Sequence, residues 1–181
     1  LLKAATPVKT KSKKFDRMFD LKPIVDFEAV FIPDEPKVLG QVLPTFAYRD
    51  VEKVLFLGIN TWNSQELIAR AGQFAEGAVF VDGFFSNSKK SSTKKFMDAY
   101  EAMFGSEPTT IEALAYDAAN VLSSIMKFGQ IASRSDLKSK IMSLKDFPGV
   151  SGKISYQDGH LVKQLTFLTV KGGKIEEVAF Q

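Results

Sequence analysis

The chain has 181 residues, of which 45% are hydrophobic and 25% are charged, and this balance is typical of a globular protein with a packed core. It excludes a disordered tail, a collagen-like chain and a coiled coil, and no segment approaches the roughly 18 continuous apolar residues of a membrane span. The net charge is +3 and cysteine is absent, which excludes disulfide scaffolds, thiol catalysis and Cys-ligated metal sites.

The first 22 residues carry the basic excess. They contain seven Lys or Arg against two Asp, a charge of +5 that leaves −2 for the rest of the chain. Nucleic-acid binding needs a basic stripe across a folded face, so we interpret residues 1–22 as a basic linker and expect no nucleic-acid partner. Because this segment has no initiator Met and no clean period, and a dense strand pattern follows it, we expect the sequence to be a fragment of a longer protein.

The first half of the chain alternates strand and helix patterns. Three apolar segments, of the kind typical of strands in parallel sheets, span residues 24–32, 54–58 and 77–81. Pro36 is placed to open a helix that Pro44 should bend or end. Asn63 or Ser64 is placed to cap a second helix. This β-α-β-α-β order predicts an open α/β sheet built by right-handed crossovers.

The second half begins with a polar loop at residues 84–92, which is long enough to connect two bodies. Helical spacing then predicts three helices, which end near residues 105, 129 and 144. Gly105 is placed as a C-terminal cap, and Thr109 with Glu112 as a capping box. Ser133 with Asp136 marks the start of the third helix. Three strand patterns follow at residues 152–156, 165–171 and 174–180, with a tight hairpin at Gly172-Gly173.

Three residues on the helices have structural interpretations. Phe96 and Tyr100 lie one helical turn apart and are expected to pack in the core. Asp117, on the longest helix, is expected to cap or bind a neighbouring backbone amide.

Motifs of catalysis are missing from the sequence. It has no Gly-rich phosphate loop and no Gly-x-Ser-x-Gly elbow. His160 is the only histidine and follows an Asp-Gly turn, so we expect a solvated surface residue rather than part of a triad or a zinc site. Adjacent carboxylates such as Asp34-Glu35 would point to opposite faces of a strand and make poor acid/base pairs. We therefore expect no catalytic residue, no bound metal, no cofactor and no enzymatic activity.

The candidate binding residues follow the first two strands, because ligands bind outside the carboxyl ends of the strands in an open parallel sheet. They are Pro33 and Asp34 after the first strand, and Asn60, Thr61 and Trp62 after the second. Together they supply donors, acceptors and one large apolar surface, the mixture that a small-molecule pocket uses. The alternative is structural: Asn60 and Thr61 would satisfy turn backbone, and Trp62 would cover the sheet edge.

Six segments resemble, in this order, the motifs of one known family. They are Asp26-Phe27-Glu28-Ala29-Val30-Phe31-Ile32-Pro33-Asp34, Leu57-Gly58-Ile59-Asn60-Thr61-Trp62, Glu76-Gly77-Ala78-Val79-Phe80, Phe96-x-x-x-Tyr100 with Phe104-Gly105-x-x-Pro108, Ala115-Tyr116-Asp117-Ala118-Ala119 and Gly149-Val150-Ser151-Gly152-Lys153-Ile154. Over about residues 26–178 the chain resembles the C-terminal half of the type I periplasmic solute-binding proteins, in the Leu/Ile/Val-binding branch. Through Phe-Ile-Pro-Asp and Val-Phe-Val-Asp-Gly-Phe-Phe it looks closest to the penicillin-binding protein activator group.

The resemblance implies two α/β lobes that close on a ligand like a hinge. It implies a three-layer open sheet of mainly parallel strands with helices on both faces, and an incomplete first lobe. Residues 23–82 and 149–181 would form the second lobe, and residues 83–148 the helical part of the first. The second-lobe wall of the cleft would be lined by Pro33, Asp34, Asn60, Thr61 and Trp62.

The resemblance further implies a non-enzymatic periplasmic receptor for a small polar or amphipathic, amino-acid-like solute, as in ABC-transporter substrate-binding proteins, with a membrane permease as partner. Amino-acid binders often carry an acidic residue for the ligand ammonium at the position of Asn60, and a neutral amide favours a different solute. The alternative is an activator of a peptidoglycan synthase, lipid-anchored to the outer membrane and acting by protein contact. Open sheet edges would also favour a homodimer. If Trp62 lines the cleft, Trp62→Ala should weaken ligand binding without unfolding the chain.

Overall fold

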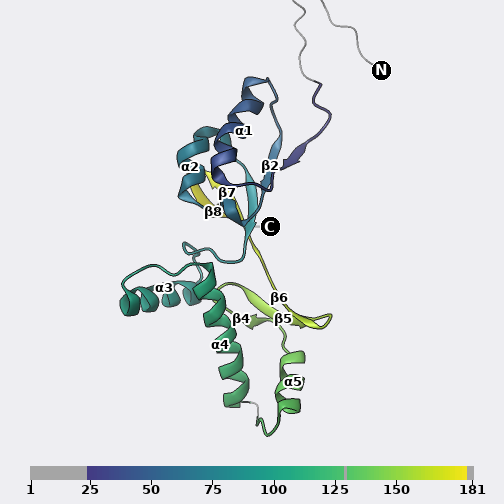
Figure 1. Ribbon diagram of the computed structural model, residues 1–181, viewed down its shortest axis with the longest axis vertical. Helices are drawn as coiled ribbons and strands as arrows, with labels where there is room; N and C mark the ends of the chain where they lie inside the picture. The colour runs from purple at the N-terminus through teal and green to yellow at the C-terminus, as the bar shows by residue number, and fades with distance from the viewer. Residues whose placement is uncertain (1–23, 129, 179–181) are drawn as a thin grey trace, which may run out of the picture.

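The computed structural model describes residues 24–128 and 130–178, which form two bodies joined by crossing segments (Figure 1). The first body, at the top of Figure 1, contains a five-stranded sheet. The second body, below it, combines helices with a three-stranded sheet. The linker predicted for residues 1–22 lies outside the described residues.

The sheet of the first body has the order β1-β2-β3-β7-β8. Its strands are β1 (Ala29–Phe31), β2 (Leu55–Gly58), β3 (Val79–Asp82), β7 (Thr166–Lys171) and β8 (Lys174–Glu177). β1, β2 and β3 run parallel, and β7 and β8 extend the sheet from β3 as an antiparallel hairpin. The predicted open α/β sheet with parallel strands is confirmed, although β1 is shorter than the segment 24–32.

Two helices connect the parallel strands: α1 (Pro36–Tyr48) and α2 (Gln65–Ala71). α1 begins at Pro36 as predicted, because the fixed φ of proline suits the first helical turn. The helix does not end at Pro44. Leu43 before this proline is buried, and Phe46 after it packs edge-on against Phe56 of β2, with ring centroids 5.2 Å apart. Packing on both sides of Pro44 therefore offsets the backbone hydrogen bond that proline cannot make.

Both helices lie on the same face of the sheet. The chain moves from β1 to β2 to β3 in one direction, and crossovers of one hand therefore place α1 and α2 side by side. The prediction put helices on both faces. In the described residues the other face instead carries apolar side chains that remain open to solvent, such as Phe31 at 59% exposure and Leu55 at 42%.

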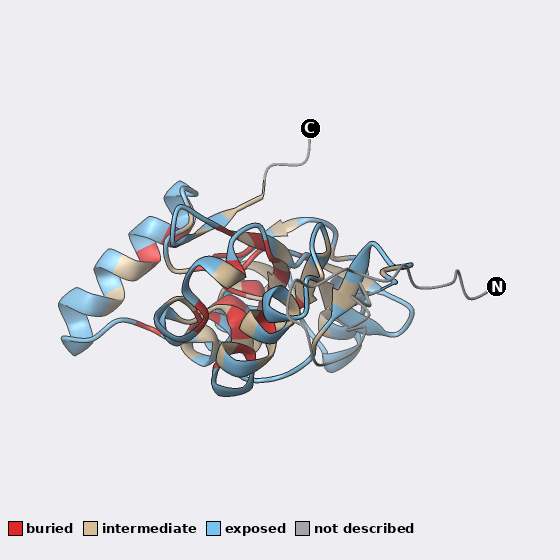
Figure 2. Ribbon diagram, turned by 90° about the horizontal axis from the view of Figure 1, so that it is seen from above, coloured by how far each residue is buried: buried red, intermediate tan, exposed pale blue. Residues whose placement is uncertain are grey.

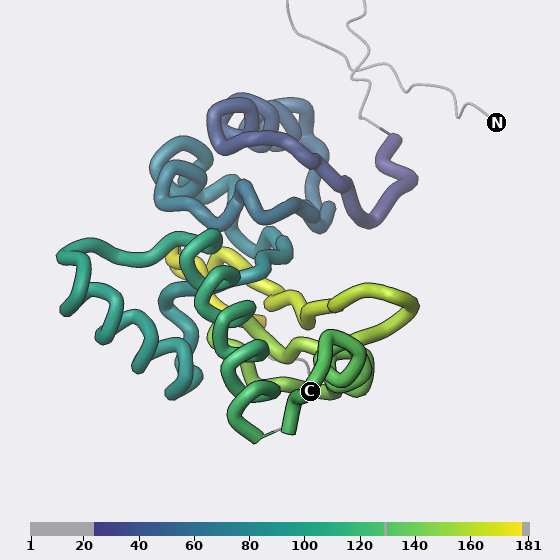
Figure 3. The backbone as a smooth tube through the Cα atoms, turned by 60° about the horizontal axis from the view of Figure 1, so that its bottom comes forward, coloured from purple at the N-terminus to yellow at the C-terminus, as the bar shows by residue number. Residues whose placement is uncertain are grey.

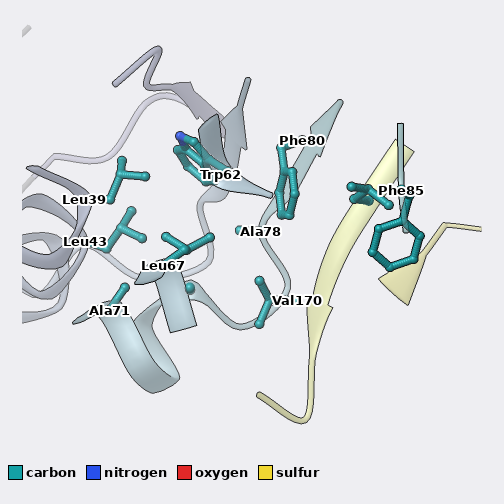
Figure 4. Packing of buried hydrophobic residues seen from close by; sticks show 11 residues of the cluster. Leu39, Leu43, Trp62, Leu67, Ala71, Ala78, Phe80, Phe85 and Val170 are labelled. Atoms are coloured by element: carbon teal, nitrogen blue, oxygen red, sulfur yellow. The ribbon is translucent and has the colours of Figure 1, made fainter. Parts of the chain in front are cut away.

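The core of the first body fills the space between this helix pair and the sheet (Figure 4). Leu39 and Leu43 of α1 and Leu67 of α2 are almost completely buried there. They pack in one cluster with Phe80 of β3 and Val170 of β7. Removal of apolar area from water is the dominant favourable term in folding, so this cluster fixes the helices on the sheet.

The β7–β8 hairpin turns at Gly172 and Gly173, as predicted. Both residues have positive φ, 57° and 70°, which glycine adopts without steric cost. Glu76 supports the turn, because its carboxylate accepts the backbone N–H of Gly172 at 2.7 Å and that of Gly173 at 3.3 Å. Residues 179 and 180, the end of the last predicted strand, lie outside the described residues.

The second body is built on α3 (Ser91–Phe104), α4 (Thr110–Phe128) and α5 (Arg134–Met142), and the predicted helix ends are confirmed. Gly105 ends α3 in the left-handed conformation, with φ 70°. Glu112 accepts the N–H and the hydroxyl of Thr109, and the hydroxyl bond lowers the pKa of Glu112. Ser133 Oγ accepts the N–H of Asp136 at 3.1 Å. α3 projects from the molecule and is mostly exposed (Figure 2).

No helix within the described ranges has both the length and the apolar character needed to cross a membrane.

A separate three-stranded antiparallel sheet completes the second body. Its strands are β4 (Phe147–Pro148), β5 (Lys153–Gln157) and β6 (His160–Lys163). The sheet lies with α4 and α5, away from α1 and α2 (Figure 3), and the Tyr156 N–H donates to the Leu144 carbonyl at 2.8 Å. Residues 149–163, which the domain prediction assigned to the second lobe, therefore pack with the helices. The chain returns to the larger sheet between Lys163 and Thr166. This boundary between the two bodies depends on which sheet each strand joins, and the local sequence pattern of the strands does not reveal it.

The side chain of Asp117 on α4 holds the turn that leads into β5. Its Oδ1 accepts the N–H of Val150 at 2.7 Å, and its Oδ2 accepts the N–H and hydroxyl of Ser151 at 2.9 and 2.5 Å. Thr93 of α3 donates its hydroxyl to the Val150 carbonyl at 2.8 Å. The expectation that Asp117 binds a backbone amide is confirmed.

A small second core lies beside this turn. Phe84, Phe96, Ala113 and Val150 form it, with Tyr100 packed against it. Phe96 is 5% exposed and its ring centroid lies 5.9 Å from that of Tyr100, which agrees with the core position predicted for the pair. The cluster joins α3, α4 and the chain segment that follows β3.

We predict that Gly58 in β2 cannot be replaced without a loss of stability, because Trp62 lies across it. A Cβ at Gly58 would come within 2.2, 2.3 and 2.6 Å of indole ring carbons. Gly58→Ala should lower the free energy of unfolding by about 1–3 kcal/mol, the range for overpacked cores, as measured by urea denaturation. In a Trp62→Ala background the same change should cost little, and an undiminished cost there would contradict the contact.

Candidate functional site

The loops that follow the three parallel strands meet at one edge of the larger sheet. They span residues 32–35 after β1, 59–64 after β2 and 83–85 after β3. The middle loop winds into a short 3-10 helix, η1 (Asn60–Trp62), and Ser64 then caps α2 by accepting the N–H of Glu66 at 3.0 Å. The carboxyl ends of parallel strands are the binding edge of this type of sheet, so these loops form the candidate site.

A side-chain hydrogen bond joins the first loop to the second. Thr61 Oγ1 donates to the Asp34 carbonyl at 2.8 Å. Asp34 also accepts the Glu35 N–H on Oδ1 at 2.8 Å, and its other carboxylate oxygen has no hydrogen bond to any described residue. The structure therefore brings Asp34 and Thr61 together. The Thr61 hydroxyl binds a backbone carbonyl of a loop, which is the role that the structural alternative gave it.

A second pair of bonds joins the middle loop to the third. Asn63 Nδ2 donates to Asp82 Oδ2 at 2.8 Å and to the Phe84 carbonyl at 3.2 Å. Asp82 is 5% exposed, and its Oδ1 accepts the N–H of Gly83 at 2.5 Å and that of Phe84 at 3.3 Å. Hydrogen bonds thus connect the three loops into one surface, in which the bonded polar groups have fixed positions. We call these three loops the tied loops.

The sequence indicated Asn63 only as a possible helix cap and missed Asp82. A signal for Asp82 was nevertheless present in the sequence. Asp34 and Asn60 were selected because they follow the carboxyl ends of the first two parallel strands. Asp82 is the last residue of the third parallel strand, so the same rule points to it. The pairing of Asn63 with Asp82 could not be read in the same way, because it depends on how the loops meet.

Three of the predicted site residues, Pro33, Asp34 and Asn60, are exposed, whereas Thr61 is half-buried. The Asn60 side chain makes no hydrogen bond within the described part of the chain, so its amide is free to donate to and accept from a ligand. The described residues hold no group of three or more His, Cys, Asp or Glu side chains placed to bind a metal ion. The predicted site residues therefore offer a neutral amide, a hydroxyl group and one carboxylate, which suits binding through hydrogen bonds.

Trp62 lies in the core rather than on the cleft wall expected for it. Its side chain is 0% exposed and packs with Leu39 and Leu43, and its ring centroid lies 6.0 Å from that of Phe80 (Figure 4). The absence of a side chain at Gly58 leaves room for the indole over β2, so η1 turns the ring inward. The indole Nε1 is buried and has no partner among the described residues.

Two further polar residues lie outside these loops. Lys163, at the end of β6, is half-buried and donates from Nζ to the Gly83 carbonyl at 2.7 Å. Burial lowers the pKa of the Lys163 ammonium, and the charges of Asp117 and Asp82 act in the opposite direction. His160 is exposed on β6 with Nδ1 3.2 Å from the carbonyl oxygen of Asp158, as expected for a surface histidine.

The sheet, its crossing segments and the tied loops are those of a two-lobed α/β binding protein. The sequence profile of the family described as Periplasmic binding protein matches residues 26–174. The chain belongs to this family. No curated protein matches it significantly.

Solved structures give the same fold. A protein described as a branched-chain amino acid ABC transporter from Rhodospirillum rubrum superposes with a TM-score of 0.75 at 21% identity, covering 83% of this chain and 44% of that one. The leucine-binding protein LivK of Thermotoga maritima gives 0.58 at 25% identity, with 84% and 44% covered. The substrate-binding protein LivJ of Streptococcus pneumoniae, solved with isoleucine, gives 0.56 at 27%, with 85% and 45% covered. The matched part of the chain thus spans less than half the length of these proteins. The predicted resemblance to the Leu/Ile/Val-binding branch is confirmed.

We predict that Trp62→Ala acts on stability first. Removal of a fully buried indole should lower the free energy of unfolding by about 3–5 kcal/mol, as measured by urea denaturation. Tyr48→Ala is the matched control, because Tyr48 is 82% exposed and its truncation should change little. An unchanged free energy of unfolding in Trp62→Ala would contradict the buried position of the ring and favour a position on the cleft wall.

A second prediction concerns the Asn63–Asp82 pair. Asn63→Asp removes both side-chain donors and sets a carboxylate beside buried Asp82, so it should cost about 1–3 kcal/mol near pH 7. Binding of one proton relieves the repulsion between two adjacent carboxylates. The penalty should therefore shrink at acidic pH, as urea denaturation at pH 7 and pH 5 would measure. Asn60→Asp, on the exposed amide of the same loop, should change stability little at either pH, and equal losses in both variants would contradict the pairing.

Proposed function

We propose that this chain forms one wall of the interlobe cleft of a non-enzymatic receptor for a small polar or amphipathic solute. The observation that carries the proposal is the tying of three strand-end loops by the Thr61–Asp34 and Asn63–Asp82 hydrogen bonds. Groups that are held in place before binding cost less entropy when a ligand arrives. Family membership supports the proposal, because LivK is described as leucine-binding and LivJ was solved with isoleucine.

Asn60 and Asp34 support the proposed class of solute. Both are exposed, and each has side-chain atoms without a partner among the described residues. A carboxylate offsets the desolvation of a ligand ammonium better than an amide does, so Asp34 is the group for a cationic end and Asn60 for a neutral or anionic one. We propose an amino-acid-like solute whose hydrogen-bonding end faces these two residues.

The proposed receptor acts outside the cytoplasm, in the periplasm, and delivers its solute to a membrane permease of the ABC type. Two of the relatives are described as an ABC transporter and as a transporter substrate-binding protein, which favours this assignment. Lipid-anchored activation of a peptidoglycan synthase by protein contact is the alternative, and it enters as an outcome of the test below.

The test is a thermal-shift screen on the intact protein that contains this chain, with free amino acids, small carboxylates and peptidoglycan fragments. A ligand at about a hundred times its dissociation constant should stabilise the folded protein by roughly 2.7 kcal/mol, a shift of several degrees in Tm. A saturable shift with one chemical class would support the receptor. Flat curves for every class would count against it and favour the protein-contact role.

Variants then assign the shift to this wall. Asn60→Ala and Thr61→Val should reduce the ligand-induced change in Tm, because each removes a polar group from the tied loops. Asn120→Ala is the matched control, since Asn120 lies on α4 in the other body. A ligand shift that is equally large in all three variants would show that the solute binds elsewhere.

A further inference from the structure

Two buried carboxylates flank the place where the chain passes between the bodies. Asp82 ends β3 in the first body and is 5% exposed, and Asp117 lies on α4 in the second body and is 1% exposed. Both accept backbone N–H groups, but within the described residues no Lys or Arg forms an ion pair with either one. Buried charge is costly unless an opposite charge lies near, so a counter-charge is needed at this point.

Lys163 supplies that charge. Its Nζ donates at 2.7 Å to the carbonyl of Gly83, the residue next to Asp82. The carboxylates of Asp117 and Asp82 both favour the charged form of Lys163, against the larger effect of its own burial. The cost of burying this ammonium is therefore partly offset by one carboxylate from each body.

Two glycines approach the Lys163 side chain and its neighbour Gln164 closely. A Cβ at Gly83 would come 2.7 Å from Lys163 Nζ and 3.4 Å from its Cε. A Cβ at Gly152 would come 2.5 Å from the Gln164 carbonyl oxygen and 3.7 Å from Lys163 Cγ. The crossing after β3, the turn before β5 and the crossing before β7 thus pack together around one side chain.

We propose that Lys163 is a positioning residue, which holds the two crossing segments together and thereby sets the orientation of the second body relative to the tied loops. Its contact with Gly83 also steadies Asp82, the residue that accepts the Asn63 amide. The proposal goes beyond solute binding and needs no ligand. Its failure would leave the proposed receptor function untouched, and a failed ligand screen would leave this proposal standing.

Distance measurement between the bodies tests it. The chain has no cysteine, so spin labels attach only where cysteines are introduced. Gln73→Cys on the first body and Lys138→Cys on α5 are exposed positions for a label pair. Double electron–electron resonance on the full chain then reports the distribution of distances between the bodies, and circular dichroism and Tm report folding separately.

Three changes at the contact should give different distributions. Lys163→Met keeps the length of the side chain and removes its charge and donors, so the distribution should broaden or its maximum should shift. Lys163→Arg keeps the charge and should restore the wild-type distribution at least in part. Lys153→Met, on the neighbouring strand β5, removes an exposed lysine and should leave the distribution unchanged.

Gly83→Ala provides a second route that leaves the charge in place. Apart from Gly83 itself and its chain neighbours, Lys163 contributes the only atoms of the described residues within 4 Å of the new Cβ, so the substitution should displace the ammonium and broaden the distribution as Lys163→Met does. Wild-type distributions in both Lys163→Met and Gly83→Ala would overturn the proposal. Loss of the folded circular dichroism signal in both would also overturn it, because Lys163 would then serve general stability rather than orientation.

Discussion

The carboxylate of Asp117 organises the turn of residues 149–152, and the second body depends on that contact. A buried backbone N–H without a partner costs about 1–3 kcal/mol, and Asp117 supplies partners to Val150 and Ser151. The space for the carboxylate exists only because residue 149 is glycine: a Cβ there would come 2.6 Å from Asp117 Oδ2. Since Thr93 bonds the Val150 carbonyl, one turn joins α3, α4 and the start of β5.

Asp82 plays the corresponding part in the first body. Its side chain binds backbone N–H groups of the chain that leaves β3, and through Asn63 it also fixes the loop that follows β2. The connection between the loops therefore depends on how the chain leaves β3. The candidate binding surface and the crossing segment after β3 share one buried carboxylate, that of Asp82.

The larger sheet shows how pattern and exposure can differ. Its parallel strands are apolar on both faces, which is typical of a sheet with both faces covered, yet α1 and α2 cover only one. Phe31 and Leu55 are exposed on the other. The part of this chain that matches the solved relatives covers only 44% and 45% of their length. In the described part of the chain, Phe31 and Leu55 thus stay open to solvent although their strands have a pattern that is apolar on both faces.

The sequence by itself determined the features that act over a few residues. The caps at Ser64, Gly105 and Ser133 and the hairpin at Gly172 were predictable, because a side chain or a glycine there satisfies backbone within about one helical turn or one tight turn. The α/β order was also readable, since strand and helix periodicities are local patterns, and the resemblance of six motifs in order implied the Leu/Ile/Val-binding-like fold. The candidate edge of the sheet followed from strand order alone.

Only the tertiary structure decided the rest. The Asn63–Asp82 bond joins residues 19 positions apart and the Lys163–Gly83 bond residues 80 apart, so no local pattern encodes either. The burial of Trp62 depends on the space that Gly58 leaves above β2, and the sheet joined by residues 153–163 depends on which partner strand lies beside them. The physical reason is common to all of these features. Hydrogen bonding and burial are satisfied by whatever lies nearest in space, and only the folded chain determines what that is.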